Sequence, residues 1–186
     1  MIAMALCYAR EHAREVRACE DYYGKYFPVY SRVCDFTLER EEDCRNSFRV
    51  LYPGVDIWIT LDTDEVIPRP DILTMLDVLK TGNYGVDICA MHILDYMTPD
   101  KVLKPQREHI PTVAVSKWVT FTDKRCCNRS KVYVLPGIIH HLYYLHESTR
   151  SENYRARGIT GLEEMRGKQE SINVPSDVRE FQEMCL

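Results

Sequence analysis

Residues 55–61, Val-Asp-Ile-Trp-Ile-Thr-Leu, form a near-continuous apolar run in this 186-residue chain. A strand with so few polar positions is typical of the centre of a parallel sheet, where both of its faces are covered. Apolar residues at helical spacing lie on either side of it, at residues 13–23, 38–52 and 71–80. Further strands are predicted at residues 2–7, 28–36, 86–94, 112–121 and 131–135. This order predicts a three-layer α/β domain with a mostly parallel central sheet.

The domain organisation follows from the same pattern. Residues 1–150 are predicted to form one domain, whose last strand ends at Pro136-Gly137. Residues 151–186 are highly charged, with helical stretches but little apolar surface. We expect this tail to pack on the domain or to take part in a contact within a homo-oligomer.

Charge and hydropathy exclude some classes of protein. The 28 acidic and 24 basic side chains give a net charge of −4, which disfavours a protein that binds nucleic acid through a basic surface. No apolar run approaches the roughly 20 residues that span a bilayer, so no transmembrane segment is predicted. The first residues lack the pattern of a signal peptide, and the expected location is the cytoplasm.

The eight cysteines do not have the spacing of a disulfide framework or a zinc knuckle, since no Cys-x-x-Cys pair occurs. Five of them stand singly in apolar segments, and we expect free, buried thiols: Cys7, Cys19, Cys34, Cys44 and Cys89. Cys126 and Cys127 are adjacent, and together with His140 they offer an alternative zinc site. Two neighbouring thiols have difficulty ligating one ion, which argues against that alternative.

An acidic cluster, Asp62-Thr63-Asp64-Glu65, comes directly after the apolar run. In extended chain, Asp62 and Asp64 project to one side and Thr63 to the other. Carboxylates crowded at the end of a buried strand suit a hard divalent cation such as Mg²⁺ or Mn²⁺, which commonly also binds substrate phosphates. The alternative is a solvated loop that only ends the strand.

A histidine cluster lies at residues 140–146, where His140, His141 and His146 occur close to a predicted strand end. One imidazole beside Asp62 and Asp64 would complete a mixed oxygen and nitrogen metal site. Because neighbouring side chains of a strand point in opposite directions, at most one of His140 and His141 should reach that site.

These segments resemble the nucleotide-sugar-dependent glycosyltransferases of GT-A fold, specifically the large inverting family two. Arg45-Asn46 followed by residues 58–67 looks like the family's Arg-Asn helix, hydrophobic strand and D-x-D-E turn. Residues 140–144, His-His-Leu-Tyr-Tyr, are similar to a paired-histidine segment found late in some of these enzymes. The resemblance covers about the first 150 residues and implies a GT-A catalytic domain.

The resemblance implies roles for particular residues. A Mn²⁺ or Mg²⁺ ion would be held by Asp64 with help from Asp62, and His140 or His141 would complete its coordination. The donor would be a UDP-sugar or GDP-sugar, and the acceptor is not identified. Residues implied in donor binding are Arg10, Glu11, Arg45, Asp62 and Thr63. For Arg45, the alternative is an ion pair with Asp43 or Glu42 on a solvated face.

An inverting transferase also needs a general base for the acceptor hydroxyl. Asp95 follows the predicted strand at residues 86–94 and is the first candidate, with Glu108 and Asp123 behind it. Asp95 could instead be an ordinary turn residue. Two further functions stay open, a nucleotidyltransferase and a catalytically degenerate GT-A module kept for binding.

Overall fold

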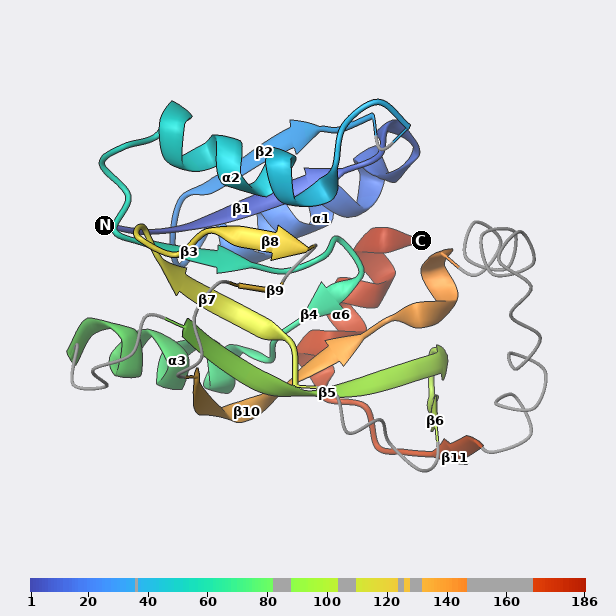
Figure 1. The fold of residues 1–186 in the computed structure, drawn as a ribbon. Coiled ribbons are helices and arrows are strands. Elements are labelled where there is room, and N and C mark those ends of the chain that lie inside the picture. The colour runs from blue at the N-terminus through green and yellow to red at the C-terminus, as the bar shows by residue number, and fades with distance from the viewer. Residues whose placement is uncertain (36, 82–87, 104–109, 124–125, 128–131, 147–168) are drawn as a thin grey trace.

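The computed structural model describes residues 1–35, 37–81, 88–103, 110–123, 126–127, 132–146 and 169–186. A twisted central sheet separates two layers of helices (Figure 1). The helices are α1 (Ala13–Tyr23), α2 (Glu41–Leu51), α3 (Arg69–Thr81) and α6 (Ser176–Cys185). The larger sheet contains β1 (Ile2–Tyr8), β2 (Val29–Val33), β3 (Ile57–Thr60), β4 (Glu65–Val66), β5 (Ile88–Thr98), β6 (Lys101–Leu103), β7 (Thr112–Ser116), β10 (Val132–His141) and β11 (Gln169–Ser171).

The sheet has two parallel parts joined by an antiparallel strand. β1 pairs in parallel with β2 and β3, and β10 pairs in parallel with β5. β7 lies between β3 and β5 and is antiparallel to both. The predicted α/β class is therefore confirmed, with a central sheet that is parallel in part.

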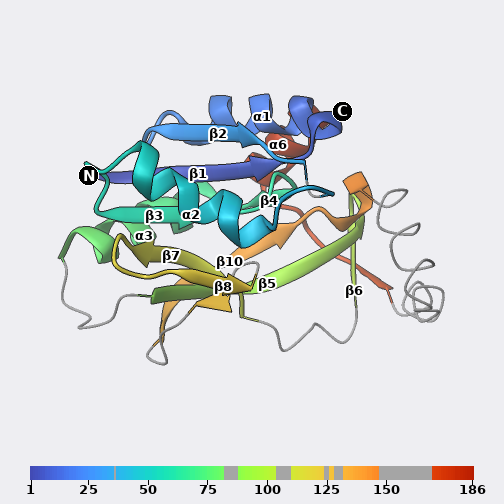
Figure 2. The same ribbon diagram turned by 45° about the horizontal axis from the view of Figure 1, so that its top comes forward.

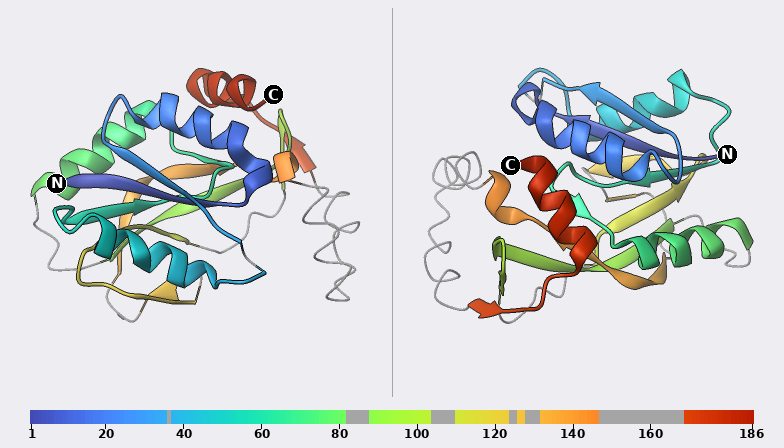
Figure 3. Two further views of the ribbon diagram at one scale, coloured as in Figure 1. Left: turned by 90° about the horizontal axis from the view of Figure 1, so that it is seen from above. Right: turned by 180° about the vertical axis from the view of Figure 1, so that it is seen from behind.

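The helices cover the two faces unequally. α1, α3 and α6 lie on one face and α2 lies on the other (Figures 2 and 3). A two-stranded sheet formed by β8 (Phe121–Asp123) and β9 (Cys126–Cys127) lies on the side of α2, where Asn46 binds the backbone of Phe121. Each face has its own apolar core, and Trp58 belongs to the core under α2. The carboxyl ends of the parallel strands lie at one edge of the sheet. Ligands of α/β sheets bind at that edge.

The last strand predicted from the sequence, which corresponds to β10, is longer in the structure. The expected end at Pro136-Gly137 is wrong, because β10 continues to His141. The register against β5 shifts between Val134 and Ile138, so the turn residues are accommodated as a bulge. Gly137 has a φ of 108°, and a Cβ there would lie 2.8 Å from the Asp71 carboxylate, so the bulge requires glycine. The continued strand carries both histidines into the sheet.

The free-thiol prediction is wrong for two cysteines. Cys34 and Cys44 form a disulfide, with their Cα atoms 6.6 Å apart. Cys34 follows β2 and Cys44 lies near the start of α2, and the short connection brings these two ends together. Sequence spacing does not reveal this proximity. Of the other cysteines whose side chains are described, Cys7, Cys19, Cys89 and Cys185 are free and buried.

The end of the chain packs into the domain. Val178, Phe181 and Cys185 of α6 are buried in the core that α1 and α3 share. The Phe181 ring meets the ring of Tyr22 edge to face at a centroid distance of 5.5 Å. Within the described residues, no helix has the length and the apolar character needed to span a membrane.

Asp177 joins the starts of two helices, and its loss has a measurable cost. Its Oδ2 accepts hydrogen bonds from the Arg69 backbone N–H (2.5 Å), at the start of α3, and from the Tyr22 hydroxyl (3.4 Å). We expect Asp177→Ala to lower the free energy of unfolding by about 1–2 kcal/mol, measured by urea denaturation, because the Arg69 N–H at the start of α3 loses its acceptor, whereas the Tyr22 hydroxyl keeps the Ile67 carbonyl. Asp77→Ala on the exposed side of α3 is the control, with an expected change within about 0.5 kcal/mol. Equal effects of the two substitutions would contradict the capping role.

Candidate functional site

The acidic turn after β3 is closed by its own last carboxylate. The Glu65 Oε2 accepts a hydrogen bond from the Asp62 backbone N–H at 3.0 Å, and the Glu65 N–H donates to the Asp62 carbonyl at 3.1 Å. Glu65 is 1% exposed. It therefore holds the turn in shape rather than presenting its carboxylate to solvent.

Asp64 points from this turn toward the end of β10. Its side chain is 1% exposed, and its Oδ2 lies 3.3 Å from Nε2 of His141. The Leu142 N–H donates to the Asp64 carbonyl at 2.7 Å, and β4 pairs with β10 so that Glu65 faces His141. These main-chain hydrogen bonds thus hold Asp64 and His141 next to each other.

His141 lies between two buried carboxylates. Its Nδ1 is 2.6 Å from Oδ1 of Asp95, because the parallel register of β5 and β10 places His141 opposite Asp95. Asp95 is 1% exposed. With Asp95 accepting the Nδ1 proton, Nε2 presents a lone pair toward Asp64 unless the ring is doubly protonated. Either a proton on Nε2 or a bound cation satisfies this contact between the imidazole and Asp64.

Asp64 and His141 are spaced as two ligands of one divalent ion such as Mn²⁺ would be. Neighbouring ligands of a six-coordinate ion with bonds of about 2.1 Å are about 3 Å apart, close to the 3.3 Å between Oδ2 and Nε2. A carboxylate on the far nitrogen of a ligating histidine is the usual arrangement, because it fixes the tautomer and raises the basicity of the ligand. Asp95 occupies that position.

Arg45 lies beside Asp62 rather than on a solvated face. Its Nη2 is 2.6 Å from Asp62 Oδ1 and 2.8 Å from Glu41 Oε1, and its side chain is 1% exposed. The alternative pairing of Arg45 with Asp43 or Glu42 is therefore not the one observed. Arg40 pairs with Glu42 instead. The i, i+4 spacing of Glu41 and Arg45 was the sequence signal for the pair that forms.

Arg45 should matter for stability as well as for binding. We expect Arg45→Met to lower the free energy of unfolding by about 2 kcal/mol, less than for a fully buried pair, because both carboxylate partners reach solvent. Arg45→Lys should recover only part of this loss, since an ammonium group cannot make the forked contacts of a guanidinium. Chemical denaturation measures both. Lys117→Met, which removes the cation from an ion pair with the exposed Asp56, is the control; a loss as large as that of Arg45→Met would contradict the special role of Arg45.

His140 points to the opposite face of the sheet from His141. Its Nδ1 lies 2.8 Å from the Tyr96 hydroxyl, and burial lowers its pKa to about 4. It lines a pocket of about 750 Å³ between the starts of α3 and α6, together with Leu94 and Asp177. The expectation that at most one of the paired histidines reaches the acidic cluster agrees with this geometry, and the structure does not bring His140 to Asp62 and Asp64.

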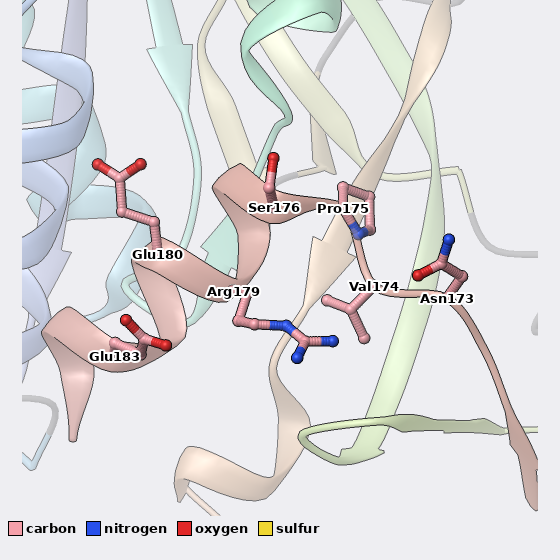
Figure 4. A pocket seen from close by; sticks show the side chains of 7 residues that line it. All are labelled: Asn173, Val174, Pro175, Ser176, Arg179, Glu180 and Glu183. Atoms are coloured by element: carbon pink, nitrogen blue, oxygen red, sulfur yellow. The ribbon is translucent and has the colours of Figure 1, made fainter.

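A second pocket, of about 510 Å³, lies on α6 and the segment before it. Its lining side chains include Arg179, Glu180 and Glu183, which project from the helix (Figure 4). None of the predicted site residues lines it. This pocket is therefore separate from the group formed by Asp64, His141 and Asp95.

The remaining predicted residues are spread around the same edge of the sheet. Arg10 and Glu11 form the exposed turn of 3-10 helix that follows β1. Thr63 is 6% exposed, and its carbonyl accepts a hydrogen bond from the Cys19 thiol. Asp62 has a side chain that is 40% exposed, so a ligand can reach it. The proposed alternative base Glu108, and the side chains of Asp123, Cys126 and Cys127, lie outside what the structure describes.

Comparisons with known proteins give distant structural likenesses. No protein-family model matches the sequence, and no curated protein matches it. A glycosyltransferase involved in the glycosylation of the major capsid of PBCV-1 is 12% identical, with a TM-score of 0.45 over 62% of this chain and 60% of that chain. A197 from STIV is 10% identical, with a TM-score of 0.40 over 62% of this chain and 64% of that chain.

A third likeness is to CMP:2-keto-3-deoxy-manno-octonic acid synthetase in complex with CTP. It is 10% identical, with a TM-score of 0.36 over 83% of this chain and 99% of that chain. The chain spans about three fifths of the length of the first two structures. At these identities and TM-scores the likenesses assign neither a family nor an activity.

Proposed function

We propose that this chain is a metal-dependent glycosyltransferase that moves a sugar, with inversion, from a nucleoside diphosphate sugar to an acceptor hydroxyl. The observation that carries the proposal is the convergence of Asp64 and His141 at the carboxyl end of β3, with Asp95 on the far nitrogen of the imidazole. UDP-sugars and GDP-sugars are the proposed donors.

Asp64 and His141 are the proposed ligands of Mn²⁺ or Mg²⁺. The bound ion would act as a Lewis acid for the diphosphate leaving group. Asp62 pairs with Arg45 and is partly exposed, so a nucleotide-sugar donor can reach its carboxylate from solvent. Arg45 donates one hydrogen bond from Nη2 to that carboxylate, and Arg10 and Glu11 extend the polar edge after β1.

Asp95 is better placed to position His141 than to act as the general base. Its carboxylate is buried and contacts the imidazole at 2.6 Å. A base for the acceptor must lie within hydrogen-bond reach of the acceptor hydroxyl. We therefore propose Asp95 as a positioning residue that keeps the Nδ1 proton on His141 and directs Nε2 toward Asp64.

Product analysis tests the proposal directly. The purified protein is incubated with UDP-sugars and GDP-sugars, with Mn²⁺ or Mg²⁺, and release of nucleoside diphosphate is measured. NMR of the anomeric proton in the product reports inversion or retention. We expect metal-dependent release of diphosphate that is lost on addition of EDTA and restored by Mn²⁺.

The same assay separates the other two functions. Release of pyrophosphate from a nucleoside triphosphate and a sugar would identify a nucleotidyltransferase. Calorimetric binding of UDP or GDP in the presence of Mn²⁺, without turnover of any donor, would identify a binding module. Absence of both nucleotide binding and turnover would overturn the transferase proposal.

A further inference from the structure

Three buried sulfur atoms meet at the corner of the sheet under α2. Cys7 lies near the end of β1, Cys34 follows β2, and Cys44 lies near the start of α2. Their sulfur atoms all lie within 4.8 Å of one another, and the residues are 7%, 2% and 0% exposed. The Cys34–Cys44 bridge uses two of the sulfurs, and the Cys7 thiol lies beside it.

Main-chain pairing places these cysteines together. β1 and β2 pair in parallel up to Tyr8 and Val33, and the Cys34 N–H continues the ladder by donating to the Tyr8 carbonyl at 2.8 Å. Cys7 and Cys44 belong to the same apolar core as Phe48 and Trp58. The three sulfurs therefore come from β1, from the residue after β2 and from α2, and they meet at one point.

We propose that, when the Cys34–Cys44 bridge is reduced, Cys7, Cys34 and Cys44 bind one thiophilic divalent cation of the Zn²⁺ class. Zn–S bonds of about 2.3 Å at tetrahedral angles place sulfur atoms about 3.8 Å apart. The Cys7 sulfur lies within 4.8 Å of the other two, and the Cys34 and Cys44 sulfurs, which are bonded in the bridge, must move apart after reduction. Thiolate is the ligand type that selects such ions over Mg²⁺ and Mn²⁺. Among the described residues, no further His, Cys, Asp or Glu joins the cluster.

The surroundings of the Cys7 thiol keep it protonated until a cation binds. Burial raises the pKa of the Cys7 thiol to about 12; of the neighbouring charges, Arg45 and Arg32 lower this pKa, and Glu41 and Asp62 raise it. The Cys7 thiol therefore holds its proton in the absence of metal. Binding of the ion by three thiols releases three protons and gives a complex with a charge of −1.

Reduction of the bridge is a balanced step with an external reductant. A water-soluble phosphine takes one oxygen atom from water and becomes a phosphine oxide, and the two sulfurs each gain one hydrogen atom. The metal site is thus available only in the reduced protein. The cysteine site is also separate from the proposed transferase site, because the two sites share no ligand residue.

Cadmium titration of the full chain tests the proposal, because thiolate-to-Cd²⁺ charge transfer gives an ultraviolet absorption band that carboxylate and imidazole ligands do not give. The protein is prepared in two forms, oxidised, with the Cys34–Cys44 bridge verified by peptide mapping, and reduced. We expect the band to saturate at one Cd²⁺ per reduced chain and to be absent from the oxidised form. Equal bands in both forms, or no band in the reduced form, would overturn the proposal.

Variants identify which cysteines are responsible. Cys7→Ser should weaken Cd²⁺ binding at least tenfold in the reduced protein, whereas Cys89→Ser, which removes a buried thiol elsewhere, should leave it unchanged. The double variant Cys126→Ser/Cys127→Ser tests the other thiols of the chain. Retention of the band in Cys7→Ser and its loss in the double variant would contradict the assignment. If Cys7→Ser does not fold, the comparison of oxidised and reduced wild-type protein still decides the question.

Discussion

Asp64→Asn is expected to abolish metal-dependent sugar transfer, with a fall in kcat/KM of about a thousandfold or more. The substitution keeps the size of a side chain that is 1% exposed but removes the negative charge facing His141. A metal ion at a leaving group supplies several kcal/mol of stabilisation, and about 4 kcal/mol corresponds to a thousandfold change in rate. Initial rates of nucleoside diphosphate release measure the loss.

The control for Asp64→Asn must separate loss of the ion from loss of the fold. Asp77→Asn changes an exposed carboxylate on α3 and should leave the rate unchanged. Circular dichroism and the unfolding midpoint establish that Asp64→Asn is folded. Calorimetry should give Mn²⁺-dependent nucleotide binding in the wild-type protein and not in the variant. A folded variant with wild-type turnover would remove Asp64 from the site.

Asp95→Asn is expected to weaken Mn²⁺ affinity by about 10- to 100-fold, the usual cost of losing the carboxylate behind a ligating histidine. The amide no longer holds the Nδ1 proton of His141 by charge, so the imidazole can adopt the wrong tautomer for coordination. Activity should fall at low Mn²⁺ and recover substantially at saturating Mn²⁺. The dependence of kcat on Mn²⁺ concentration is the measurement.

This result distinguishes the positioning role of Asp95 from that of a general base. If Asp95 removed the acceptor proton, Asp95→Asn would lower kcat at every Mn²⁺ concentration and leave the Mn²⁺ affinity unchanged. A His141→Ala variant should lose Mn²⁺ affinity at least as strongly as Asp95→Asn. Full activity of His141→Ala at low Mn²⁺ would contradict the role of both residues.

Much of the architecture follows from local pattern. The apolar run at residues 55–61 contains β3, and the helical stripes at residues 13–23 and 71–80 correspond closely to α1 and α3. These predictions succeed because strand burial and helical periodicity are properties of neighbouring residues. The antiparallel insertion of β7 was not predicted, since an isolated strand does not encode the direction of its partners.

The candidate site divides in the same way. The sequence predicted an acidic turn at a strand exit and the opposite directions of His140 and His141. It did not predict that Asp95 would lie behind His141, because that contact depends on the register of β10 against β5 after a bulge at Gly137. It also gave Arg45 the wrong alternative partners, although Glu41 stands four residues before it.

By itself, the sequence determined the α/β class, the acidic turn after the central strand and the alternation of the paired histidines, because each depends on spacing within one segment. Only the tertiary structure decided which groups meet: Asp64 with His141 and Asp95, Arg45 with Asp62, and the three sulfurs of Cys7, Cys34 and Cys44. These contacts join residues that are far apart in the chain. Their geometry is set by strand pairing and helix packing, which no local pattern specifies.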